Sequence, residues 1–158
     1  NGPSAIVGMS PWWLEEGRVH FRGYTQLLIQ ADGGGANSYD CWLWKAGLQA
    51  LADEFQLIIT VTHFPTGASK WNPIEHRMFS PISQNWAGQP LVSYETMLKF
   101  IRTTRTDTGF HCRARLDTAT YNTGRKITPE EKAQINLQPR RVFPEWNYTI
   151  RHGSVSKK

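Results

Sequence analysis

Two acidic residues occupy positions where carboxylates commonly do metal chemistry. Asp32 follows a short apolar run, Gln26 to Ala31, and is followed by three glycines. A carboxylate at the end of a buried strand, beside glycines that let a metal ion or phosphate approach the backbone closely, is well placed to coordinate Mg²⁺ or Mn²⁺. The alternative is that Asp32 closes a tight Asp-Gly turn.

Glu75 offers the second carboxylate. The run Asn72-Pro73-Ile74-Glu75 predicts a helix with Asn72 as N-cap and Glu75 at its third position. The positive end of a helix favours an ionised carboxylate, which a divalent cation requires, although Glu75 can instead simply complete a capping box. The 42 residues between Asp32 and Glu75 fit one crossover, which predicts both carboxylates on one rim of a sheet.

The elements that must position these residues alternate between helix and strand. The pattern predicts buried strands over 26–31 and 57–61 and helices over 3–16, 44–55 and 72–86. The signals expected at their ends are a stop at Gly17, a cap at Ser38 or Asp40, and a kink or break at Pro81. This order favours an α/β layer with parallel strands.

The sequence of the second half of the chain predicts further helices and strands. Ser93 caps a helix that runs to about Arg105, and Thr128 opens a short helix with a capping box. Residues 110–116 alternate between apolar and mostly basic side chains, which predicts a half-buried strand with a basic outer face. A last extended segment is expected over 145–150.

Charge is distributed unevenly along the chain. The net charge is +5, but residues 1–98 carry five basic and eight acidic residues, whereas residues 99–158 carry thirteen basic and five acidic ones. Such asymmetry indicates a basic half that faces a polyanion, or else a solvated surface without a partner. The candidate phosphate contacts are Lys70, Arg102, Arg105, Arg113, Arg115, Arg125 and Lys126. His63 and His76 flank the second acidic block, either as further contacts or as ordinary surface residues.

Composition excludes several other classes of protein. The apolar content of 39%, with 7 Trp, 7 Phe and 5 Tyr, excludes wholesale disorder. No apolar run approaches the roughly 18 residues of a membrane span. Two cysteines make no disulfide framework, so we expect a reducing, cytoplasmic location.

Several sequence blocks resemble a known family. Residues 62–76, THFPTGASKWNPIEH, are similar to the last catalytic block of bacterial insertion-sequence transposases of the DDE class, and residues 31–37, ADGGGAN, to the middle block. Trp44-Lys45, residues 48–52 and the stretch EWNYTI at 145–150 resemble the Rhodopirellula-type transposase DDE domain in particular. The resemblance extends from about Trp12 to Arg151.

The resemblance implies a fold and a domain organisation. The expected fold class is α/β: a partial ribonuclease-H-like core that lacks its opening strands, with a basic α+β C-terminal extension. Residues 1–90 would form the core, residues 91–151 the extension packed on it, and residues 152–158 a flexible tail. Asp32 and Glu75 would be the second and third of three acidic metal ligands. The first is expected on an opening strand, yet only Glu15 and Glu16, in a predicted helix, precede Asp32.

The function implied by the resemblance is Mg²⁺- or Mn²⁺-dependent cleavage and transfer of DNA strands by the full-length protein. Without the first acid, we expect weak or absent metal binding and no activity from this chain. Two alternatives stay open: a non-catalytic DNA-binding remnant, and an α/β fragment that forms a homodimer through an exposed sheet edge.

Overall fold

The computed structural model describes residues 5–65, 67–118, 120 and 125–153. The chain forms two compact units, one of Asn1–Thr66 with Tyr121–Lys158 and one of Gly67–Thr120. The first holds a four-stranded sheet and the second is mainly helical, so the expected mixed α/β architecture is confirmed. No helix in the described ranges is long and apolar enough to cross a bilayer.

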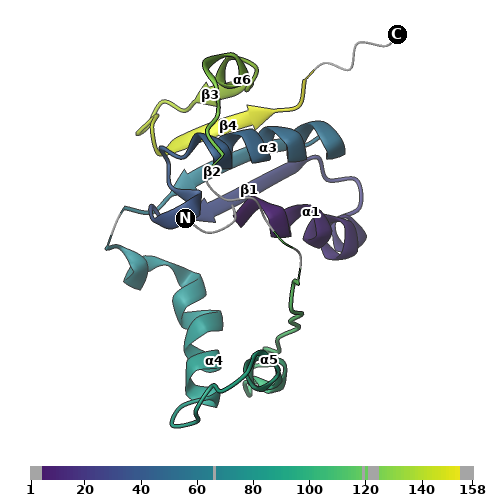
Figure 1. Cartoon of the computed structure of the whole chain (residues 1–158), viewed down its shortest axis with the longest axis vertical. Helices are drawn as coiled ribbons and strands as arrows, with labels where there is room; N and C mark the ends of the chain where they lie inside the picture. Colours follow the sequence, from purple (N-terminus) through teal and green to yellow (C-terminus); the bar gives the residue numbers. More distant parts are fainter. Residues whose placement is uncertain (1–4, 66, 119, 121–124, 154–158) are drawn as a thin grey trace. The chain divides into compact units, whose positions relative to one another are not determined.

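The sheet of the first unit has the strand order β1-β2-β4-β3 (Figure 1). The predicted parallel pair is confirmed: β1 (Gln26–Ala31) pairs with β2 (Ile58–His63), which places Ala31 opposite His63. The predicted last extended segment is β4 (Asn147–Arg151), which runs antiparallel to both β2 and the short β3 (Leu137–Pro139). Two elements that follow residue 90 therefore complete the sheet formed by β1 and β2.

One face of the sheet is covered by α3 (Trp42–Phe55) (Figure 1). The core lies between them, and its fully buried members include Leu48, Ala52, Ile59, Val61 and Ile150. The cap predicted at Ser38 or Asp40 is wrong, because the N-cap is Cys41 and no side chain caps the helix. Ser38 instead donates a hydrogen bond to Asp40 at 2.5 Å.

The N-terminal helical segment runs further than its sequence predicts. It comprises η1 (Ala5–Gly8), α1 (Met9–Trp12), the π-helical turn η2 (Trp13–Gly17) and α2 (Arg18–His20). The predicted stop at Gly17 is wrong: a Cβ there would meet the Trp13 ring at 2.4 Å, so the glycine serves packing rather than termination. The predicted start at Pro3 lies outside the described residues.

The short helix α6 (Pro129–Ala133) begins as its sequence predicts. The Thr128 side chain accepts a hydrogen bond from the backbone N–H of Glu131, and the Glu131 carboxylate accepts one from the N–H of Thr128. The predicted capping box is therefore confirmed.

The second unit contains the turn η4 (Ser69–Trp71), the π-helical turn η5 (Glu75–Phe79), α4 (Ser80–Asn85) and α5 (Tyr94–Thr103). The change from π to α geometry falls next to Pro81, where a break was predicted. The predicted cap of α5 is confirmed, since Ser93 Oγ accepts from the N–H of Thr96 at 3.1 Å.

The strand predicted over 110–116 is wrong. Within the described part of this unit, the segment forms one isolated bridge, between His111 and Arg105, and no ladder. None of the strands formed by the described residues pairs with this segment, and the carbonyl of Ala114 instead accepts a hydrogen bond from Arg102 Nε at 2.7 Å. The alternation of burial holds from Phe110 to Arg115, with Arg113 and Arg115 exposed on either side of a half-buried Ala114, but Leu116, expected inside, is exposed.

Candidate metal site at the end of β1

Asp32 follows β1 directly, and its side chain is exposed. Its Oδ1 accepts a hydrogen bond at 3.0 Å from Nδ2 of Asn37, the last residue of η3 (Gly35–Asn37). Gly35 has a φ of +66°, a conformation that glycine adopts without strain. The turn thus holds one carboxylate oxygen and leaves the other without a hydrogen bond to any described residue.

A hydrogen-bonded chain of buried side chains supports the Asp32 backbone. Trp44 Nε1 donates to Tyr148 Oη at 3.0 Å, Tyr148 Oη lies 3.2 Å from His63 Nε2, and His63 Nδ1 lies 3.4 Å from the carbonyl oxygen of Asp32. Because a carbonyl only accepts, the proton belongs on Nδ1, and Nε2 accepts from the Tyr148 hydroxyl. Every polar side-chain atom of Trp44, Tyr148 and His63 then has a hydrogen-bond partner.

The protein environment keeps the side chains of His63 and Tyr148 uncharged. Burial lowers the pKa of His63; the hydrogen bond to the Asp32 carbonyl opposes that shift, and the nearby Lys45 ammonium adds to it. Burial raises the pKa of Tyr148 against the opposing hydrogen bond from Trp44. A neutral His63 therefore acts as a fixed support for the turn.

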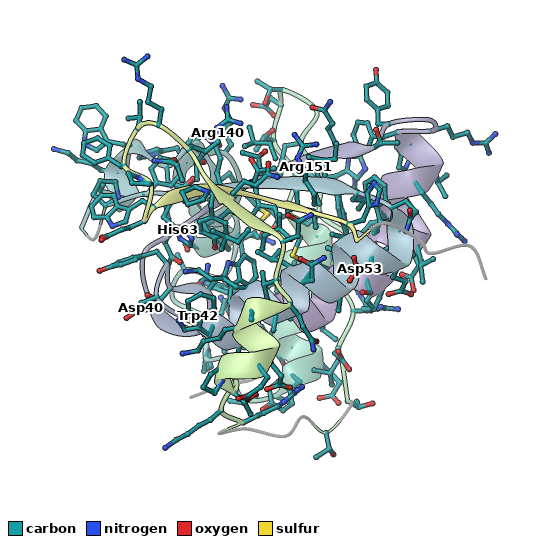
Figure 2. The ribbon with its side chains drawn as sticks, turned by 90° about the horizontal axis from the view of Figure 1, so that it is seen from above. Asp40, Trp42, Asp53, His63, Arg140 and Arg151 are labelled. Carbon is teal, nitrogen blue, oxygen red and sulfur yellow. The ribbon has the colours of Figure 1, made fainter. Side chains whose placement is uncertain are left out.

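His63 is not an ordinary surface residue, because only 6% of it is exposed. The signal was present in the sequence: Ile59, Val61 and His63 recur at every second position of a strand and share its buried face. In Figure 2, His63, Asp40 and Trp42 lie toward one end of α3 and Asp53 toward the other.

Lys45 adds a positive charge at the same end of α3, and sequence reasoning missed it as a site residue. Its Nζ lies 4.7 Å from the centroid of the Trp42 ring and 5.2 Å from that of Tyr148. Burial lowers the pKa of Lys45, and the charge of Asp40 opposes this. Its spacing of three residues from Trp42 on a helix is the signal that could have indicated the contact.

Glu75 lies in the second unit, in the first turn of η5. Asn72 Oδ1 accepts from the N–H of Ile74 at 3.3 Å, as expected of an N-cap. The alternative role of Glu75 is not realised: its carboxylate forms no hydrogen bond or ion pair with any residue that the structure describes. Glu75 as a whole residue is half-buried.

Asp32 belongs to the first compact unit and Glu75 to the second. Across the described ranges, no three His, Cys, Asp or Glu side chains gather closely enough to hold a metal ion. A single exposed carboxylate such as Asp32 still suits Mg²⁺, which binds one or two carboxylates and completes its shell with water and phosphate oxygens. The shared cation stays a prediction.

The basic residues predicted to contact phosphate lie in both units. Arg125, paired with Glu131, and Lys126 are in the first unit. In the second unit, Lys70 Nζ lies 5.0 Å from the Trp71 ring centroid, and the Lys70 carbonyl lies 2.7 Å from His76 Nε2. Of the others, Arg102 bonds to a backbone carbonyl, and Arg105, Arg113 and Arg115 are exposed. Their binding to DNA stays a prediction.

Comparison with known protein families identifies the class of protein to which this chain belongs. A family model described as the Rhodopirellula transposase DDE domain matches residues 3–152, almost the whole chain. The chain belongs to this family of transposase domains. Comparison with curated proteins and with solved structures gave no match.

Proposed function

We propose that this chain acts in DNA transposition, with Asp32 and Glu75 as ligands of divalent cations during cleavage and joining of DNA strands. The main support is the exposed Asp32 at the end of β1, whose carboxylate accepts a hydrogen bond from Asn37 and whose backbone carbonyl lies against His63, in a member of a DDE transposase family. Bound cations would activate a water or a DNA 3′-hydroxyl and stabilise the leaving oxygen. The chain's own residues hold the ligand oxygens and bind the DNA backbone.

The finer fold assignment is part of this proposal. We assign β1, β2 and α3 to a ribonuclease-H-like core, whose sheet β3 and β4 complete, and residues 91–151 as a whole to the basic C-terminal part of the chain. Among the described strands β1 pairs with β2 alone, and an opening strand that carries the first acid would add to its other edge. Glu15 and Glu16 do not replace that acid, because they lie in the helical turn η2. These 158 residues therefore bind metal weakly and cut no DNA by themselves.

Titration with Mn²⁺, followed by electron paramagnetic resonance, tests the ligand assignment. We expect Asp32→Asn and Glu75→Gln each to weaken Mn²⁺ binding about 10-fold, the effect of roughly 1.4 kcal/mol. Glu54→Gln is the matched control, since this exposed carboxylate of α3 forms no ion pair with a described residue; its binding should be unchanged. Binding that is the same in all four proteins contradicts the proposal.

A nicking assay on supercoiled DNA tests the proposed inactivity. We expect no Mn²⁺-dependent nicking by the 158-residue chain. Nicking that disappears in Asp32→Ala would contradict inactivity and would mean that two acidic ligands suffice.

A second candidate function is DNA binding without catalysis, which the exposed, positively charged residues Arg113 and Arg115 favour. Salt-sensitive DNA binding that is independent of Asp32 and Glu75, together with no metal binding, would support it. A third is self-association through β1, whose Leu28 is 62% exposed at the sheet edge. A concentration-dependent dimer that Leu28→Lys abolishes would support that alternative.

A further inference from the structure

The loop between β3 and β4, residues 140–146, exposes apolar side chains that the core does not use. Val142 is 63% exposed and Phe143 is 69% exposed. Arg140 and Arg141 precede them directly. Large apolar side chains held in water beside positive charge are typical of a binding surface.

The loop is held in one conformation. Asn147 Nδ2 donates to the carbonyls of Val142 at 3.0 Å and of Phe143 at 3.2 Å, and the backbone N–H groups of Trp146 and Asn147 both donate to the Phe143 carbonyl at 2.9 Å. Phe143 itself has a φ of +44°, an unfavourable value for a residue with a side chain. The hydrogen bonds therefore hold the ring of Phe143 outward in spite of backbone strain.

A series of aromatic rings connects this loop to the Asp32 turn within the first unit. Phe143 stacks on Trp146 with ring centroids 6.1 Å apart and an interplanar angle of 29°. Trp146 contacts Tyr39 at 5.8 Å, and Tyr39 contacts His63 at 6.3 Å. His63 in turn contacts the Asp32 backbone, so the exposed stack is continuous with the candidate metal site.

The charge around the stack is suited to a polyanion. Arg140 and Arg141 are exposed and form no ion pair with the residues that the structure describes. The one acid of the loop, Glu145, acts electrostatically on Lys45. An exposed aromatic face next to free guanidinium groups complements the face of a nucleobase and the phosphates that flank it.

We propose that the β3–β4 loop binds an unpaired nucleotide of a DNA strand, with the base stacked on Phe143 and Arg140 and Arg141 on adjacent phosphates. The assignment of DNA as the ligand rests on the proposed function. Stacking and phosphate contacts need no metal ion, so DNA binding is measured in the presence of EDTA. The result then does not depend on whether Asp32 and Glu75 bind a cation.

The test is fluorescence anisotropy with a labelled oligothymidylate and with a duplex of the same length, in EDTA. Phe143→Gly removes the ring and relieves the backbone strain, so the variant should fold at least as well as the original protein. We expect its affinity for the single strand to fall about 10-fold, the range that loss of one base stack produces, with little change for the duplex. Val92→Ala, an exposed apolar position outside this loop, should bind both DNAs as the original protein does.

Arg140→Gln with Arg141→Gln provides the electrostatic arm. This double variant should weaken binding of both DNAs and lower the salt dependence of single-strand binding, because about two phosphate contacts are lost. Single-strand affinity of Phe143→Gly equal to that of the original protein overturns the proposal. If the original protein self-associates and Phe143→Gly does not, while single-strand affinity is unchanged, the patch is a protein interface and the proposal is also overturned.

Discussion

At the scale of single residues, Tyr148 is the point at which the buried polar groups of the candidate site meet. Its hydroxyl accepts from Trp44 and bonds to His63, and only 1% of the residue is exposed. Through His63 it reaches the Asp32 backbone, although it stands 116 positions later in the sequence. The position of the candidate ligand therefore depends on a residue of β4.

Removing that hydroxyl leaves two buried polar atoms without a partner. We expect Tyr148→Phe to lower the free energy of unfolding by about 1–3 kcal/mol. The matched control is Tyr94→Phe, because Tyr94 is 65% exposed, and its effect should be within about 0.5 kcal/mol. Urea denaturation measures both; equal stabilities of the two variants would contradict the hydrogen-bonded chain.

Stability should also depend on pH through Tyr148. Burial raises its pKa in the folded protein, so the folded state keeps the hydroxyl proton at a pH where the unfolded chain, with a tyrosine pKa of about 10, loses it. Above pH 10 the unfolded state thus binds fewer protons, and the free energy of unfolding falls as the pH rises. Tyr148→Phe lacks this contribution, so the stability difference between the two proteins should shrink from pH 9 to 11. A constant difference would contradict the shift.

At the scale of secondary-structure elements, the most accurate predictions from sequence were those of strands and helices whose capping residues and apolar patterns agree with their packing in the fold. The parallel strands β1 and β2, the Ser93 cap and the Thr128 capping box formed as expected, although β1, predicted to be buried, exposes one face at the sheet edge. The strand over 110–116 failed because alternation indicates a half-buried face and does not supply a partner strand. β3 escaped prediction because a three-residue strand has too little pattern of its own.

The cap of α5 offers a test at this scale. Ser93→Ala removes the oxygen that accepts from the N–H of Thr96, and we expect a loss of about 1 kcal/mol of local stability. Hydrogen exchange at the Thr96 amide should accelerate about 5-fold, the equivalent of that energy. The matched control is Ser80→Ala in α4, a serine that caps no helix, where exchange at Thr96 should be unchanged. Unchanged exchange in Ser93→Ala would mean that the cap contributes nothing.

At the scale of the whole molecule, the candidate ligands come from two compact units. The place of Asp32 at the end of a strand was predictable because the acid follows an apolar run, and the place of Glu75 at the start of a helix because Asn72 and a proline precede it. Their role as metal ligands stays a prediction. The support from His63, Tyr148 and Trp44 was harder to predict, since it joins β2, β4 and α3 through contacts that are distant in sequence. Family membership explains why these separate signals occur in one chain.

The most direct test of the shared cation is cleavage of the protein backbone by Fe²⁺ with ascorbate and peroxide, because a bound iron ion cuts only the nearby chain. We expect cuts close to both Asp32 and Glu75, both suppressed by excess Mg²⁺ and both lost in Asp32→Asn. Cuts near one residue alone, or cuts near Glu75 that persist in Asp32→Asn, would contradict a cation held in common by the two carboxylates.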